Sequence, residues 1–463
     1  MSLDLAPTPY DVLVDERFGP IRKVIEFPLP PRFPRPLVTR GADVAHSLAP
    51  TRWHADRAAV GAAFDDESAA RQAAIGEAVE RYCGNFVPSG LRRASYDELR
   101  RAGLPALDPH ELVLFSPRQY AAAGFPFVPF TRDLRVQWVP GHDLATGAET
   151  LLPASWVYCN YHFGERIGVE PPTHGVIYAG VAAGPSRDFA ERSAIEELIE
   201  RDATAIWWHS GAPAVGLDVT DSTLLRRAMV SVEDIVEYHF FRIPSLFNSP
   251  VIGCLMHDRE LDVVGAGFAC RTDATAAALK ALSEAIGTWF YSTGLLDPNG
   301  AVWSAIDAGA LDARAYKPHR ADRRYLDDFR ADFRDVIDLG SQLQVYLDPR
   351  MLSHTRRMTD IPERIAIGEV PGAPSAGSHD RGHYLDELSR RGLRAYSVDL
   401  TTSDVRPSGL RVVRVLVPGL YPNAPAALPH LGGTRLYTEP EALGLLEEPL
   451  TEDRVDLTPI PHA

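Results

Sequence analysis

The sequence predicts an α+β fold in which helices pack on mixed and antiparallel sheets. Helical and strand-like patterns are intermixed, without the regular strand–helix alternation of a doubly wound nucleotide fold. Three segments have the 3.6-residue apolar period of amphipathic helices, and several short apolar segments are bounded by turn residues. A large core is possible, because the chain has 463 residues of which 45% are hydrophobic.

Residues 1–44 are expected to form a lead and a connector, and residues 45–463 a single large domain. The lead contains two strand-like stretches, Asp11–Val14 and Ile21–Phe27. The proline-rich stretch Phe27–Pro36 follows. We interpret it as a semi-rigid extended connector rather than as a ligand for a proline-recognising domain, because connectors of this composition are common.

The three long helices are expected at Glu67–Cys83, Arg187–His209 and Ala274–Thr293. Asp65 and Asp66 supply capping groups for the first. The remaining pattern is strand-like, apart from a small-residue segment at Gly175–Gly184, a helix at Gly382–Arg391 and short helices within residues 300–375. The strand-like segments are Leu112–Ala154, Ile235–Arg242, Val251–His257, Leu261–Ala269, Ala395–Leu400 and Arg411–Val417.

Charge and composition exclude several classes of function. The formal net charge of −15 argues against nucleic acid or an anionic membrane as a partner, since both bind basic surfaces. We find no signal peptide and no apolar run long enough to span a bilayer. The four cysteines are widely spaced and fit neither a disulfide framework nor a zinc site. We therefore expect a soluble cytoplasmic protein with reduced cysteines.

One acidic pattern occurs in all three predicted helices. It reads A-R-Q-A-A-I-G-E-A-V-E-R-Y in the first and A-E-R-S-A-I-E-E-L-I-E-R-D in the second, with a weaker form in the third. Carboxylates at positions i and i+3, with an arginine at i+4, lie on one face of a helix. The residues concerned are Glu77, Glu80 and Arg81, then Glu197, Glu200 and Arg201, and finally Glu284.

A single acidic helix face is most often a solvated surface, but the repetition favours a shared site. The second copy also has apolar residues around most of its circumference, so its acids are expected to be paired or metal-bound. Mg²⁺ prefers oxygen ligands and usually combines one or two carboxylates with substrate phosphates. The arginines could bind phosphate or pair with the acids. No Walker loop, dinucleotide fingerprint, H-E-x-x-H or G-x-S-x-G motif is present.

These motifs resemble the YcaO family. The resemblance rests on A-I-G-E-A-V-E-R-Y-C from Ala74, G-V-A-A-G leading to A-I-E-E-L-I-E-R-D-A, A-L-S-E-A from Ala281, and V-V-R-V-L-V-P-G-L from Val412. The match covers roughly residues 45–463. More narrowly, the chain resembles the YcaO cyclodehydratases of thiazole/oxazole-modified peptide biosynthesis, some of which make antibiotics.

The resemblance implies an enzyme with ATP and Mg²⁺ as cofactors. In such enzymes a Cys, Ser or Thr side chain of a ribosomally made precursor peptide attacks the preceding amide carbonyl. The oxyanion is phosphorylated, and loss of phosphate leaves an azoline ring. The residues implied to bind Mg-ATP are Glu77, Glu80, Arg81, Ser193, Glu197, Glu200, Arg201 and Glu284. Among these, the metal ligands would be Glu77, Glu80, Glu197 and Glu200, and the catalytic residues Glu80, Glu200 and Arg201.

The chain departs from the family pattern at three places. Ala73 stands where Ser is frequent, Gly287 stands where Gln is usual, and the tail has Pro459 and Pro461 but one proline fewer than P-x-P-x-P. No cysteine-rich leader-recognition domain is evident. We therefore expect a separate leader-peptide-binding partner, similar to ThiF or ubiquitin-activating enzymes. A flavin dehydrogenase in the same pathway and a homodimer are further expectations from the family.

Two alternatives remain open from the sequence. The same ATP-dependent step could serve thioamide or amidine formation with another nucleophile. A non-catalytic YcaO-like scaffold is favoured slightly by the changes at Ala73 and Gly287, whereas the intact acid pairs argue against it.

Overall fold

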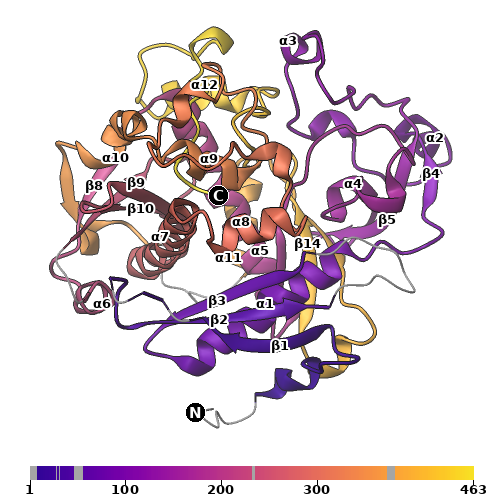
Figure 1. Ribbon diagram of the computed structural model, residues 1–463. Helices are drawn as coiled ribbons and strands as arrows, with labels where there is room; N and C mark the ends of the chain where they lie inside the picture. Colours follow the sequence, from indigo (N-terminus) through magenta and orange to yellow (C-terminus); the bar gives the residue numbers. More distant parts are fainter. Residues whose placement is uncertain (1–7, 28, 31, 46–55, 232–234, 373–380) are drawn as a thin grey trace. The chain divides into compact units, whose positions relative to one another are not determined.

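The computed structural model describes residues 8–27, 29–30, 32–45, 56–231, 235–372 and 381–463 (Figure 1). The chain divides into two compact units, each assembled from segments that are distant in sequence. The first unit comprises Met1–Leu29, Leu37–Leu198 and His379–Leu420, and the second comprises Pro30–Pro36, Ile199–Ser378 and Tyr421–Ala463. Both units contain helices and antiparallel strands, so the α+β prediction is confirmed.

A three-stranded antiparallel sheet in the first unit carries helix α1 (Glu67–Asn85). Asp66 caps the helix as expected, since its side chain accepts a hydrogen bond from the backbone N–H of Ala69 at 2.8 Å. The helix approaches the sheet so closely that a Cβ on Gly61 would lie 2.1 Å from the backbone nitrogen of Ala74. The strands, in sheet order, are β1 (Ile21–Glu26), β2 (Leu37–Val44) and β3 (Ala58–Phe64).

The second sheet of the first unit has six strands, all paired antiparallel. Its order is β4-β5-β13-β14-β7, with β6 pairing with β5. Strand β7 leads into α5 (Arg187–Ser210), so this sheet positions the helix that carries the second acidic copy. The strands are β4 (Arg92–Ala94), β5 (Val136–Asp143), β6 (Glu149–Pro153), β7 (Val181–Gly184), β13 (Tyr396–Asp399) and β14 (Arg411–Leu416).

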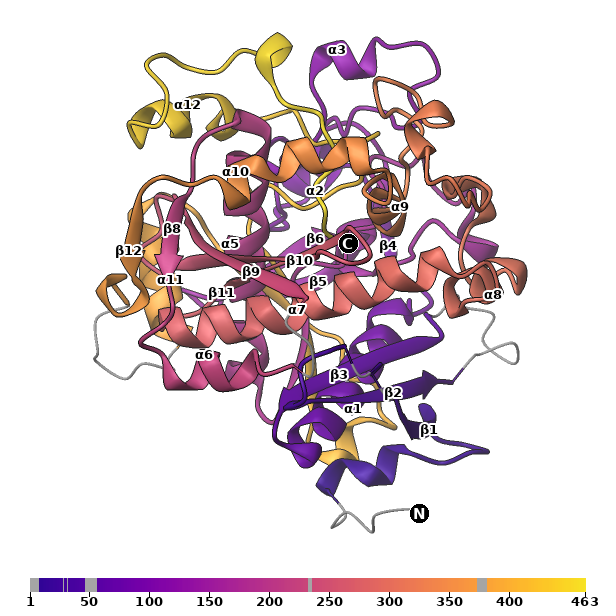
Figure 2. The same ribbon diagram turned by 60° about the vertical axis from the view of Figure 1, so that its left-hand side comes forward.

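The second unit is built on a five-stranded sheet, across which helix α7 (Ala274–Leu296) lies (Figure 2). Glycines in β11 permit this packing, because a Cβ on Gly267 would lie 2.2 Å from the carbonyl oxygen of Ala281. All pairs are antiparallel except β8 with β12, which is parallel. The strands, in sheet order, are β11 (Val263–Cys270), β10 (Val251–Asp258), β9 (Val236–Ile243), β8 (Val215–Asp218) and β12 (Arg364–Ala366).

Helix α5 spans the division, which falls between Leu198 and Ile199. The three long helices lie within a few residues of their predicted bounds. The same holds for the strands that were predicted after residue 234. The other helices are α2 (Tyr96–Arg101), α3 (Pro117–Tyr120), α4 (Ala154–Val157), α6 (Thr223–Ala228), α8 (Ala301–Asp307), α9 (Leu339–Val345), α10 (Arg356–Thr359), α11 (Arg381–Arg390) and α12 (Arg435–Ala442).

Two sequence predictions are wrong. The segment Asp11–Val14 is not a strand, because a 3₁₀ helix occupies Pro9–Leu13. Its first turn is closed by the side chain of Asp11, which accepts a hydrogen bond from the backbone N–H of Thr8 at 2.6 Å. In Leu112–Ala154 only the second half forms strands, since the first half is irregular around the four-residue helix α3.

The proline-rich segment contributes one anchor to the second unit. Phe33 is buried there and its ring stacks on Trp289 with centroids 4.0 Å apart. Pro28 and Pro31 of the predicted connector lie outside the described residues. None of the helices in the described part of the chain combines the length and apolar character needed to cross a bilayer.

Candidate active site

The first copy of the acidic pattern lies on α1, and backbone donors hold its two carboxylates. Glu77 Oε2 accepts a hydrogen bond from the N–H of Val60 at 3.1 Å, and Glu77 Oε1 lies 3.3 Å from Arg81 Nη2. Glu80 Oε1 accepts a hydrogen bond from the N–H of Ala183 at 2.7 Å. Strands β3 and β7 therefore fix the orientation of the acids that α1 presents.

Glu197 on α5 is held in the same way by the chain segment that precedes the helix. Its Oε2 accepts a hydrogen bond from the N–H of Gly180 at 2.9 Å. Gly180 has a φ of +93°, and a Cβ there would lie 2.5 Å from the carbonyl oxygen of Val415, so only glycine fits. The G-V-A-A-G segment thus donates backbone hydrogen bonds to acids on both helices, to Glu197 from Gly180 and to Glu80 from Ala183.

The charge state of Glu80 distinguishes this cluster from a row of surface acids. Burial raises the pKa of Glu80 to about 8, against the hydrogen bond from Ala183, and the nearby carboxylates of Glu77 and Glu197 raise it further. Without a cation, the carboxyl is mostly protonated at neutral pH. A divalent cation would reverse this, because its charge favours the ionised form.

Arg81 is fixed beside the acids of the first unit. Its guanidinium carbon lies 4.4 Å from the centroid of the Tyr178 ring, and its Nη2 faces Glu77. Burial lowers the pKa of Arg81, but Glu77 and Asp56 raise it above its ordinary value, so the side chain remains a cation. Asp56 also accepts a hydrogen bond from the Tyr178 hydroxyl at 3.1 Å.

In the second unit, cations accompany the acids of the pattern. Buried Glu200 places Oε1 3.2 Å from Arg201 Nε, and Glu284 Oε1 lies 3.2 Å from Lys280 Nζ on α7. Burial would raise the pKa of Glu284, but chiefly the charges of Lys280 and Arg201 lower it to about 2. Glu284 is therefore ionised at neutral pH, in contrast to Glu80.

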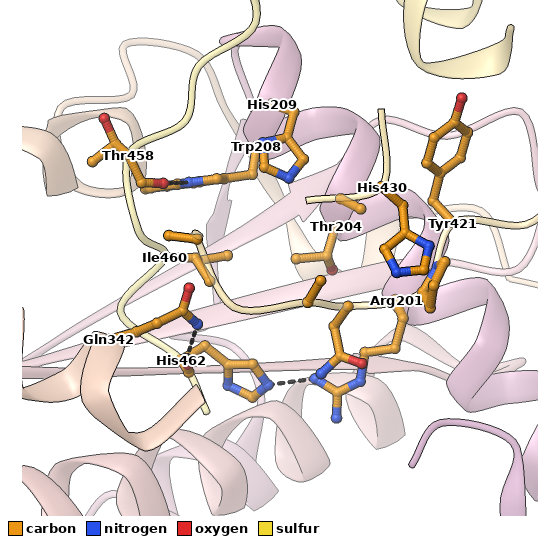
Figure 3. A pocket seen from close by; sticks show the side chains of 15 residues that line it. Arg201, Thr204, Trp208, His209, Gln342, Tyr421, His430, Thr458, Ile460 and His462 are labelled. Carbon is orange, nitrogen blue, oxygen red and sulfur yellow. Dashed lines mark hydrogen bonds between the residues drawn. The ribbon is translucent and has the colours of Figure 1, made fainter. Parts of the chain in front are cut away.

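His462 lies outside the sequence motifs that predict the site, and it contacts Arg201 directly (Figure 3). Its Nδ1 lies 3.0 Å from the carbonyl oxygen of Ala266, and Gln342 donates a hydrogen bond to its backbone oxygen at 3.0 Å. Burial and Arg201 lower the pKa of His462 to about 4, so the ring is neutral. Nδ1–H therefore donates to Ala266, and Nε2 accepts from Arg201 Nη1.

The proline-containing tail reaches this position through backbone contacts with the second unit. The backbone N–H of Ala266 in β11 donates to the carbonyl oxygen of Pro461 at 2.9 Å, and the hydroxyl of Tyr346 donates to the carbonyl oxygen of Pro459 at 2.8 Å. In the sequence, only P-I-P-H could have indicated this position of His462, because alternate prolines favour an extended backbone that can present the imidazole.

A pocket adjoins Arg201 within the second unit, with a cavity volume of about 50 Å³. In Figure 3, Arg201 and His462 lie at one end, Trp208 and Thr458 at the other. The wall is formed by α5, α9, the segment after β14 and the tail. Its residues are Arg201, Thr204, Ala205, Trp208, His209, Gln342, Tyr421–Ala424, Ala426, His430, Thr458, Ile460 and His462.

The predicted site residues fall into two groups. In the first unit Glu77, Glu80, Arg81 and Glu197 come together, and Ser193 lies half-buried one turn before Glu197 on α5. In the second unit Glu200, Arg201 and Glu284 come together.

Two other acids of the second copy have structural partners. Glu196 is buried and accepts a hydrogen bond from the Tyr384 hydroxyl at 2.7 Å. Asp202 is buried and binds Arg435 through both oxygens, at 2.7 and 2.8 Å. The repeat therefore combines candidate ligands with residues that anchor α5.

The carboxylates of the first unit fit a magnesium ion that arrives with a nucleotide. Within the described ranges, no group of three or more His, Cys, Asp or Glu side chains is arranged to hold a metal ion alone. Mg²⁺ does not need such a cage, because it usually takes one or two carboxylates and completes its octahedron with water and phosphate oxygens. The charges of Glu77 and Glu197, which raise the pKa of Glu80, supply the negative potential for that ion.

The sequence matches the model of one protein family over most of its length. Residues 61–421 match the family model described as YcaO cyclodehydratase, ATP- and Mg²⁺-binding. The chain belongs to the YcaO family. No curated protein matches it in sequence.

Solved structures share the fold. A heterocyclase in complex with substrate and cofactor has a TM-score of 0.70 at 21% identity, over 98% of this chain and 57% of the other. The heterocyclase TruD has a TM-score of 0.57 at 22% identity, over 84% and 50%. YcaO from Methanopyrus kandleri, bound with AMPPCP and Mg²⁺, has a TM-score of 0.56 at 18% identity, over 87% and 86%. The chain thus spans about half the length of the two heterocyclases.

Proposed function

We propose that the chain is a cyclodehydratase that uses Mg-ATP to convert Cys, Ser or Thr residues of a ribosomally made precursor peptide into azolines. Membership of the YcaO family supports the ATP-dependent class. The observation that carries the site assignment is the state of Glu80, whose pKa is raised to about 8 by burial and by its carboxylate neighbours. Such a carboxyl is stabilised in its ionised form when a cation binds.

The acids of the first unit would hold the magnesium ion, with Arg81 beside them. Glu77, Glu80 and Glu197 each have one oxygen engaged by a backbone N–H, which keeps the carboxylates from turning away. Arg81 remains charged and is aligned by the Tyr178 ring, so it can bind a phosphate oxygen.

The residues of the second unit would bind and balance phosphate charge. Arg201 is oriented by Glu200 on one side and by His462 on the other, and a planar guanidinium matches the geometry of phosphate oxygens. Glu284 stays ionised next to Lys280, so the pair is a second candidate for contacts to hydrated magnesium or to ribose hydroxyls. Ser193 is proposed as a further cofactor contact from α5.

The bound nucleotide supplies a phosphoryl group that turns a poor leaving group into a good one. In the proposed reaction, the peptide side chain attacks the preceding amide carbon after losing its proton. The former carbonyl oxygen takes the γ-phosphoryl group and departs as phosphate, while the amide nitrogen loses its proton and becomes the ring nitrogen. Arg201 is proposed to stabilise the negative charge that develops during phosphoryl transfer. Glu80 would act through the magnesium ion that it helps to hold, and Glu200 by orienting Arg201.

The test is magnesium-dependent nucleotide binding and turnover, with Glu200→Gln as the variant. Glu200→Gln keeps the shape of the buried side chain but removes the charge that faces Arg201. We expect loss of ATP turnover with an unchanged circular dichroism spectrum, which shows that the variant is folded. Glu441→Gln, at an exposed position of α12, is the control and should keep full turnover.

Unchanged ATP turnover in Glu200→Gln would remove α5 from the site. An unmodified chain that binds no nucleotide, with or without Mg²⁺ and alone or with its partner, would instead favour a scaffold. Thioamide or amidine formation would show as ATP turnover that depends on sulfide or on an amine nucleophile.

We also propose that a separate leader-peptide-binding protein delivers the precursor. The proposal fails if the isolated chain binds and modifies a precursor peptide at the full rate of the combined system.

A further inference from the structure

The pocket beside Arg201 suits a small uncharged ligand. Among the described residues that line it, none carries a carboxylate or an ammonium group, although the whole chain has a net charge of −15. Burial lowers the pKa of both His209 and His462, so their rings are neutral at neutral pH. Arg201 is then the permanent charge at one end, and an ionised ligand group elsewhere in the pocket would lose its hydration without a partner.

The size of the pocket limits the ligand further. A cavity volume of about 50 Å³ accepts several water-sized positions, which corresponds to a small aliphatic or hydroxyl-bearing side chain rather than to an indole or a purine ring. Apolar surface from Trp208 and Ile460 faces this space. Ala205 on α5 also lines the pocket, and its side chain is a single methyl group. A larger side chain at position 205 would fill it.

One polar group inside the pocket has no partner. Thr204 is 7% exposed, and its hydroxyl finds no hydrogen-bond partner within the described part of the chain. A buried hydroxyl without a partner costs free energy, so such groups usually meet a ligand or an ordered water. Thr204 lies on α5 three residues after Arg201, so both side chains border the same space.

We propose that this pocket binds a small uncharged side chain of the precursor peptide, next to the amide that is activated. This inference rests on the proposed function, because the ligand must be placed beside Arg201 when the nucleotide is bound. The Thr204 hydroxyl bonds to the peptide backbone or to a hydroxyl of that side chain, and Ala205 provides the room. The pocket then determines which residue can precede the cyclised one.

The test measures binding of short capped peptides that carry one cysteine and differ only in the preceding residue, which is valine, tryptophan or glutamate. Binding is followed by NMR titration of the full chain, with and without AMPPCP and Mg²⁺. We expect the unmodified chain to bind the valine peptide about tenfold more tightly than the other two. Ala205→Leu should weaken the valine peptide by about tenfold, and Thr204→Val by about fivefold. Ala301→Leu, at an exposed position of α8, is the control and should leave peptide binding unchanged.

Each other outcome overturns the inference. Equal binding of the three peptides, no binding of any, or no effect of Ala205→Leu would show that the pocket does not read the peptide. Loss of AMPPCP binding in Ala205→Leu with peptide binding retained would assign the pocket to the nucleotide. Failure of the proposed function is separate, because it appears as absence of Mg-dependent AMPPCP binding to the unmodified chain.

Discussion

Magnesium binding should expel a proton from Glu80. The pKa of this carboxyl is raised to about 8 by burial and by the carboxylates of Glu77 and Glu197. At pH 7 a group with that pKa is protonated in about nine tenths of the molecules, since the ratio is about ten to one. A metal-bound carboxylate must be ionised. Binding of Mg-ATP at pH 7 should therefore release about 0.9 proton from this group, and about 0.1 at pH 9.

The assay is calorimetric titration in two buffers whose ionisation enthalpies differ, such as phosphate and Tris. The change of apparent binding enthalpy with buffer ionisation enthalpy gives the number of protons released. Nucleotide and magnesium release protons of their own, so the informative quantity is the difference between the unmodified chain and Glu80→Gln. If Glu80→Gln still binds, we expect this difference to be about one proton at pH 7.

Glu197→Gln serves as the matched variant. It removes one of the like charges that raise the pKa of Glu80, so it should lower the proton release at pH 7 without abolishing it. Glu441→Gln on α12 should leave the release unchanged. Equal proton release by the unmodified chain and by Glu80→Gln would refute the reasoning, because the displaced proton would then come from elsewhere.

The same shift predicts how pH affects the chain without magnesium. Because the folded pKa of Glu80 is raised, the folded chain holds a proton that the unfolded chain loses near pH 4.5. Its stabilising effect is present at low pH and is lost as pH rises through about 8. As pH rises, the unmodified chain should therefore lose stability relative to Glu80→Gln. Thermal unfolding without magnesium measures this change.

Three further predictions concern stability and can be measured by urea unfolding. Gly287→Ala should stabilise the chain by about 0.5–1 kcal/mol, because a Cβ at this position in the middle of α7 meets no atom within 4 Å. Gly267→Ala in β11 should instead destabilise it, because the Cβ would lie 2.2 Å from a carbonyl oxygen of α7. Arg435→Met should cost about 3 kcal/mol, since buried Asp202 would lose its partner. His462→Phe should be less stable than the unmodified chain near neutral pH, and this difference should shrink as pH falls from about 6.5 towards 4. The reason is that the lowered pKa of the imidazole favours folding only while the ring is neutral.

The parts of the site that follow from local geometry could be predicted from the sequence. The spacing of Glu77, Glu80 and Arg81 places them on one face of α1 because helix geometry depends only on neighbouring residues. The segment G-V-A-A-G is visible in the sequence, but its role as a donor of backbone hydrogen bonds to the acids is not. Its backbone N–H groups reach Glu80 and Glu197 only after β7 has paired with β14, and that pairing joins segments more than two hundred residues apart.

The contacts of His462 show the same limit more strongly. Its ring contacts Arg201, 261 positions earlier in the chain, and Ala266 in β11. Neither contact has a periodic signal in the sequence.

Strands β2 and β3 could not be predicted from the sequence for another reason. Their small residues, such as A-A-V-G-A-A-F in β3, lack the alternation of large apolar and polar side chains by which a half-buried strand is recognised.

The environment of each acidic copy, rather than its sequence, determines what the copy can bind. In the first unit, Glu80 has like charges and a backbone N–H as neighbours, and its pKa is raised. In the second unit, Glu284 has Lys280 and Arg201 nearby, and its pKa is lowered. The first environment attracts a cation, whereas the second already contains cations that can face phosphate. One repeated pattern therefore stands in two different electrostatic environments, one acidic and the other containing cations.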